Sequence, residues 1–203
     1  MRTKLFFILP VLALISFTGT AQKFKVLSGN FEALKNEKAF NVDFDYSEAT
    51  FFKEKMSEAD YVKKRQKEIT SDKGAAEAAV WLADWEKTKE ETMPGKFLAS
   101  ANKFNGKGIT YSKGTDSPYT LVVKTTWVDP GWFGGVVKKP SVLNTILNFV
   151  ASDNPDHVVL SISCNGAIGD IYPTGIPNTN DRIAEAYAKT SKEFVGFMKK
   201  KIK

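Results

Sequence analysis

The chain has 203 residues, of which 26% are charged, a formal net charge of +6, one cysteine and one histidine. This length suits one domain with a substantial core. A single cysteine excludes an internal disulfide. With one cysteine and one histidine, the chain lacks the three or four ligands that a zinc site usually has. The net charge is mildly positive, but the sequence shows neither the basic stripe nor the motif of a nucleic-acid-binding protein.

The first 21 residues are typical of a secretory signal peptide. Residues 1–4 are basic, residues 5–17 are almost entirely apolar, and residues 18–21 are small. The apolar run is shorter than the about 20 residues of a spanning helix, which argues against the alternative of an uncleaved membrane anchor. The sole cysteine, Cys164, lies too far along the chain to carry a lipid at the cleavage site. We expect cleavage after Ala21, so that residues 22–203 form a single soluble domain in the periplasm or outside the cell.

Two strands are expected near the start of this domain, over residues 24–29 and 40–46. In the second, Phe40, Val42 and Phe44 alternate with polar residues, so one face is apolar and the other is solvated. Their closeness in sequence predicts that the two strands pair as a hairpin with a long loop.

Helices are expected next. Ser57 with Asp60 three residues later indicates a helix start, and residues 75–92 form a second helix that ends before Pro94. A short third helix covers residues 97–104. Trp81 and Trp85 lie one turn apart on the second helix. We expect them to anchor it to the sheet; the alternative is an exposed stacking platform for a sugar.

The second half of the chain predicts three strands and a final helix. The strands cover residues 119–128, 142–150 and 157–164 and should form an antiparallel meander. The final helix follows a cap at residues 178–180. Together these elements predict an α+β fold, in which helices pack on one face of a largely antiparallel sheet made of the N-terminal hairpin and the three-stranded meander.

Three stretches of the sequence carry a resemblance to known proteins: residues 24–29 with 41–46, residues 119–125 leading into Pro130-Gly131-Trp132, and residues 182–189. Together they resemble a family of uncharacterised exported bacterial α+β proteins. The architecture of that family is loosely similar to the envelope domains of the TolB N-terminal and curli-secretion type. The resemblance implies no enzymatic activity and no catalytic residues, and it spans nearly the whole mature chain.

Candidate catalytic groups are few. His157 opens a strand after a turn, and we interpret it as a solvated strand-end residue, because no nucleophile lies at triad spacing. Asp43 and Asp45 share a strand face, with Cα atoms about 6.5–7 Å apart, which overlaps the carboxyl spacing of some glycosidases. Asp170 is a further acid in a glycine-containing loop. The sequence predicts no metal site and no cofactor.

The loop of residues 130–135 is the strongest candidate for a contact site. Trp132 and Phe133 lie there between glycines, and large apolar side chains on a loop can contact a protein partner, a sugar or a lipid. The alternative, which we favour, is that Trp132 or Phe133 folds back over the end of the sheet, while the glycines permit the turn. The exposure of Trp132 decides between the two.

Two functional hypotheses follow. The favoured one is a secreted, non-catalytic envelope protein that binds a protein partner or a glycan and has no nucleic-acid partner and no transmembrane anchor. The alternative is a hydrolase of glycans or other envelope material that uses Asp43, Asp45 or Asp170. It requires acids that converge in a cleft, at least one of them with a raised pKa.

Overall fold

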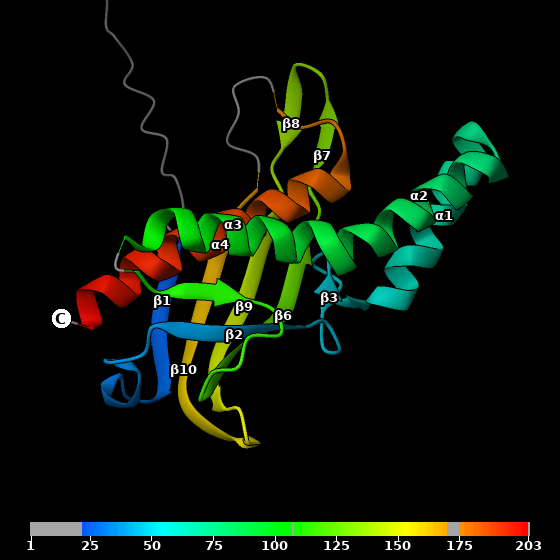
Figure 1. Cartoon of the computed structure of the whole chain (residues 1–203). Coiled ribbons are helices and arrows are strands. Elements are labelled where there is room, and N and C mark those ends of the chain that lie inside the picture. Colours follow the sequence, from blue (N-terminus) through cyan, green and yellow to red (C-terminus); the bar gives the residue numbers. More distant parts are fainter. Residues whose placement is uncertain (1–21, 107, 170–174, 203) are drawn as a thin grey trace, which may run out of the picture.

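The structure, a computed structural model, describes residues 22–106, 108–169 and 175–202 (Figure 1). The expected signal peptide and Asp170 lie outside these residues.

One mixed sheet forms the centre of the molecule. Its hydrogen-bonded order is β1-β10-β9-β6-β2-β5. The short strand β3 pairs with β6 beyond the end of β2, on the same side of β6, and also pairs with β4. The strands are β1 (Lys23–Gly29), β2 (Ala39–Asp45), β3 (Thr50–Phe51), β4 (Met56–Ser57), β5 (Thr110–Ser112), β6 (Tyr119–Asp129), β9 (Val142–Ala151) and β10 (Asn154–Ile168).

The predicted meander is confirmed. β6, β9 and β10 are consecutive antiparallel neighbours, with Phe149 of β9 opposite both Leu121 and Leu160. All three of these side chains are fully buried, because they lie on the sheet face that the helices cover. The α+β class, with a mostly antiparallel sheet and helices packed against it, is confirmed as well.

The predicted hairpin between the first two strands is wrong. β1 pairs antiparallel with β10 at one edge, whereas β2 lies parallel to β6 and β5 near the other edge. Between them, a short helix η1 (Glu32–Leu34) anchors the connection through the buried Leu34. The alternation in β2 specifies which of its faces is buried, but it does not specify a neighbouring strand.

Within the residues that the structure describes, four α-helices complete the fold. Ser57 caps α1 as predicted, because its Oγ accepts a hydrogen bond from the Asp60 N–H at 3.1 Å. The predicted break at Pro94 is wrong, since a π-helical turn connects α2 to α3 and Pro94 occupies the first turn of α3, where its missing N–H costs little. The helical segments are α1 (Glu58–Lys73), α2 (Ala75–Lys87), η2 (Thr88–Thr92), α3 (Met93–Asn105) and α4 (Thr179–Lys201).

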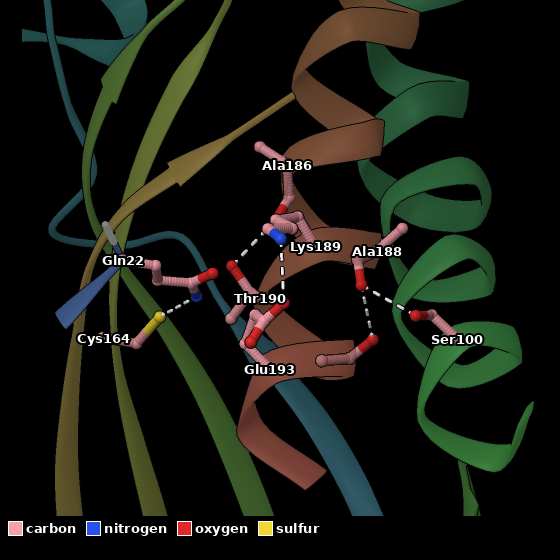
Figure 2. A network of polar contacts seen from close by, with 9 residues as sticks. Gln22, Ser100, Cys164, Ala186, Ala188, Lys189, Thr190 and Glu193 are labelled. Carbon is pink, nitrogen blue, oxygen red and sulfur yellow. Dashed lines mark hydrogen bonds and ion pairs between the residues drawn. The ribbon is translucent and has the colours of Figure 1, made fainter. Parts of the chain in front are cut away.

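Helices α3 and α4 lie side by side over one face of the sheet (Figures 1 and 2). At their contact, the Ser100 hydroxyl donates to the Ala188 carbonyl at 2.8 Å. On the sheet side of α4, the Gln22 side-chain amide donates to Sγ of the buried Cys164 at 2.7 Å. Burial raises the pKa of Cys164 to about 11, so this thiol is protonated and inert at neutral pH.

The tryptophan pair connects the α1–α2 hairpin to the sheet. Trp85 is buried and stacks on Trp81 with ring centroids 6.2 Å apart, and Trp85 also contacts Phe51 of β3. The Arg65 guanidinium lies 5.9 Å from the centre of the Trp81 ring. Because these neighbours occupy the indole rings, the pair anchors helix to sheet, as expected, and is not a platform for sugar stacking.

Candidate functional site: an anchored hairpin with an apolar tip

The predicted aromatic loop is a small β-hairpin that stands beyond the ends of β6 and β9 (Figure 1). Its strands are β7 (Trp132–Gly134) and β8 (Val137–Lys139), which pair antiparallel. Two independent sets of contacts hold its base.

The first set is centred on the buried Asp129, the last residue of β6. Asp129 Oδ1 accepts a hydrogen bond from the Gly131 N–H at 3.0 Å, and Oδ2 pairs with Lys139 Nζ at 2.5 Å. These contacts tie both strands of the hairpin to the end of β6. Gly131 has φ +62°, and a Cβ there would come within 2.2 Å of the Lys139 carbonyl oxygen, so only glycine suits this position.

The second set comes from Arg182, in the first turn of α4, which is 1% exposed. Its Nη1 donates to the carbonyls of Ile176 at 2.6 Å and Pro177 at 2.8 Å. Its Nη2 donates to Thr179 Oγ1 at 3.0 Å and approaches the Pro130 carbonyl at 3.5 Å.

The backbone carbonyl of Arg182 adds a further contact, because it accepts a hydrogen bond from Ser141 Oγ at 2.7 Å. Residues on both sides of the hairpin, Pro130 and Ser141, therefore contact this one residue. Sequence reasoning missed the role of Arg182. The available signal was a cation in the first turn of a helix, where the helix dipole disfavours positive charge.

The two aromatic side chains of the hairpin point to different environments. Phe133 and its cross-strand partner Lys138 lie against Gly175, where an added Cβ would be 2.7 Å from the Phe133 ring. Trp132 lies on the other face, 49% exposed, so Phe133 folds back and Trp132 does not. Val137 shares the Trp132 face and is 62% exposed, and Val136 in the turn is 100% exposed.

These three side chains make the hairpin tip the main exposed apolar cluster among the described residues. Across all the described residues, seven large hydrophobic side chains are exposed. Three of them, Trp132, Val136 and Val137, belong to this one hairpin. Contiguous exposed apolar surface on a rigid frame is typical of a contact site. From here on, Trp132, Val136 and Val137 are called the apolar tip.

Asp43, Asp45 and His157 lie on strands other than those of this hairpin. Asp43 is exposed on β2, and His157 is exposed on β10. Asp45 is partly buried, which favours its neutral form, but hydrogen bonds from the Ser47 hydroxyl and N–H and the charge of Lys124 outweigh this effect and lower its pKa. A general acid needs the opposite shift. Within the described residues, no three histidine, cysteine or acidic side chains are grouped to hold a metal ion.

The lowered pKa of Asp45 predicts a contribution to acid sensitivity. Because the pKa is lower in the folded state, the contribution is present above the ordinary pKa and is lost as the pH falls through the folded-state value. We expect the fall in the free energy of unfolding between about pH 6 and about pH 2 to be smaller in Asp45→Asn than in the wild type, as measured by urea denaturation. Equal falls in the two proteins would contradict this assignment.

No protein-family model and no curated protein matches the sequence. Among solved structures, the chain is similar to the PelC dodecamer from Paraburkholderia phytofirmans, with 12% identity, 84% of this chain and 95% of that chain covered, and a TM-score of 0.38. A single-residue variant of the same dodecamer gives 11% identity, 87% and 96% coverage, and a TM-score of 0.37. At TM-scores this low, the likeness carries no weight for fold or function.

In the described part of the chain, no helix is both long and apolar enough to cross a membrane.

Proposed function

We propose that this chain is an exported, non-catalytic binding protein that uses the apolar tip to hold an envelope protein or an envelope glycan. The observation that carries the proposal is the combination of a firmly held base with an exposed tip. Arg182 and Asp129 hold the base through buried polar contacts, whereas Trp132 is half exposed and Val136 has no covering neighbours.

The energetics of interfaces support this choice. Tryptophan is among the residues most enriched at binding hot spots, because it buries a large apolar area with few rotatable bonds. A rigid support lowers the entropy that is lost on binding. The Phe133 contact with Gly175 and the Asp129–Lys139 ion pair provide that rigidity.

The experiment replaces the apolar tip while leaving its support intact. The double variant Trp132→Ser with Val137→Ser should weaken partner binding at least about tenfold, since hot-spot truncations of this kind commonly have effects of that size or more. Its free energy of unfolding should change by less than about 1 kcal/mol, because neither side chain is buried in the core. Binding is measured with the tagged full-length chain against envelope extract and against a glycan panel.

Matched controls are available elsewhere on the surface. Val80, 64% exposed on α2, and Leu27, 48% exposed on β1, resemble the tip residues in size and exposure. The variants Val80→Ser and Leu27→Ser should bind like the wild type. Retained binding by the Trp132/Val137 variant, or an equal loss in the controls, would contradict the proposal.

A photo-reactive side chain at Val136 identifies the partner class. We expect one cross-linked species of defined mass that is absent when the same side chain is placed at Val80. Sensitivity of this species to protease indicates a protein partner, and sensitivity to glycosidase indicates a glycan. The absence of any specific species would count against both.

A further inference from the structure

A second candidate site lies at the opposite end of α4 from the hairpin. There, a cavity of about 210 Å³ opens between the last turns of α4, the end of α3, β5 and the segment that precedes β2. At about 30 Å³ per water molecule, this volume corresponds to roughly seven waters, which is room for a small organic ligand. The site is independent of the proposed function of the apolar tip.

The deep part of the cavity is apolar. Val195 and Met198 of α4 are buried in the core and line it, and the partly buried Ile109 and Ile202 flank them. Such walls favour an aliphatic group.

Two polar side chains, those of Tyr111 and Asn105, interrupt this apolar lining, and Asn105 Nδ2 donates to the Ile109 carbonyl at 2.6 Å. Tyr111 of β5 is 2% exposed, and its ring is fixed between Phe40 and Phe194, with ring centroids 5.6 and 6.2 Å away. Its backbone groups pair with Asn102, but its hydroxyl has no hydrogen-bond partner among residues 22–106, 108–169 and 175–202. Burial raises the pKa of Tyr111, so the hydroxyl stays protonated and can donate. Because the hydroxyl oxygen is not fully enclosed by protein, it can donate to an acceptor on a ligand in the cavity.

The rim of the cavity is positively charged. Lys35, Lys38 and Lys199 lie there with a single acid, Glu37, so three positive charges against one negative charge leave +2. Lys35 pairs with Glu32 at 2.7 Å, and Lys199 Nζ donates to the Phe104 carbonyl at 2.5 Å. The Lys38 ammonium has no hydrogen bond or ion pair with any residue that the structure describes, which leaves it available to an anion.

We propose that this cavity binds a medium-chain carboxylate. The aliphatic chain lies on Val195 and Met198, while the carboxylate accepts a hydrogen bond from the Tyr111 hydroxyl and faces Lys38. Each part of the ligand is complementary to one feature of the site. The aliphatic chain packs on the apolar walls, the carboxylate oxygen accepts from the Tyr111 hydroxyl, and the negative charge of the carboxylate is attracted by the lysines of the rim.

The test is calorimetric titration of the full chain with octanoate, below the concentration at which it forms micelles. Acetate, which has the head group without the chain, and octylammonium, which has the chain with the opposite charge, serve as comparison ligands. We expect saturable binding of octanoate at one site per chain and no measurable binding of the other two. Absence of saturable octanoate binding, or equal binding of octylammonium, overturns the proposal.

Two variants place the ligand in the cavity. Tyr111→Phe and Lys38→Glu should each weaken octanoate binding about fivefold or more, since each removes one charge-assisted contact. Lys25→Glu on β1 makes the same charge change at an exposed site away from the cavity and should bind like the wild type. Without ligand, Tyr111→Phe should change the free energy of unfolding by less than about 1 kcal/mol, because the hydroxyl makes no hydrogen bond to any residue that the structure describes.

Octanoate binding can be tested independently of partner binding by the apolar tip. The Trp132→Ser with Val137→Ser variant should bind octanoate like the wild type, and a photo-reactive octanoate analogue should label α4 near Met198. Labelling confined to the hairpin, or unchanged affinity in both Tyr111→Phe and Lys38→Glu, overturns the cavity proposal and leaves the proposed function of the tip standing.

Discussion

Replacing Arg182 with methionine is expected to lower the free energy of unfolding by about 2–4 kcal/mol, because several hydrogen bonds from one buried guanidinium are lost together. Methionine fills similar space but donates no hydrogen bond. The carbonyls of Ile176 and Pro177 would lose their donors at 2.6 and 2.8 Å, and a hydrogen bond to a charged group contributes about 1.5–3 kcal/mol before the part that water recovers at these partly buried bonds.

Urea denaturation measures the global effect, and hydrogen exchange of the hairpin amides measures the local one. Exchange in β7 and β8 should accelerate more than exchange in β9, because Arg182 contacts Pro130 at the base of the hairpin. Lys192→Met, an exposed substitution on the same helix, should change stability by less than about 1 kcal/mol. A loss below about 1 kcal/mol in Arg182→Met would contradict the anchoring role.

Arg182→Lys gives a sharper test of the geometry. The lysine ammonium is a point donor, whereas the planar guanidinium donates from two nitrogens to several acceptors at once. We therefore expect lysine to recover less than half of the lost stability. Full recovery would mean that the charge matters and the fork of donors does not.

Gly131→Ala is expected to destabilise the protein by about 3 kcal/mol or more and to displace the hairpin. Part of this effect is the strain of a side chain at φ +62°, about 1–2 kcal/mol. The larger part is steric, since the new Cβ would lie 2.2 Å from the Lys139 carbonyl oxygen and 2.5 Å from that of Pro140. Neither atom can move without breaking the base that Asp129 holds.

Gly135→Ala is the matched control in the same hairpin. Gly135 also has a positive φ, +79°, but no atom lies within 4 Å of the position of an added Cβ. Gly135→Ala should therefore lower the free energy of unfolding only by the backbone strain of about 1–2 kcal/mol. Equal destabilisation by the two alanines, measured by urea denaturation, would show that the close approach at Gly131 is relieved without cost. Partner binding should fall in Gly131→Ala, because the apolar tip is no longer held in place.

The alternating and helical patterns of the sequence determined the α+β class, the antiparallel meander of β6, β9 and β10, and the Ser57 cap. These features depend on local periodicity and on contacts between neighbouring elements, which a sequence displays directly. The same pattern in β2 placed Phe40 and Val42 on the buried face, yet it could not show that the strand runs parallel to β6, because alternation carries no information about the partner strand.

The candidate site shows the same division. The sequence identified residues 130–135 as an aromatic loop between glycines, but not which aromatic ring faces solvent. That was decided by Gly175, which lies far along the chain and offers Phe133 a surface without a side chain, and by Arg182, which holds the hairpin base. The unpaired hydroxyl of Tyr111 likewise emerges only where β5, α3 and α4 meet. The exposure of a side chain and its hydrogen bonds depend on which residues pack against it. Those neighbours are often distant in sequence, so only the tertiary structure decided these features.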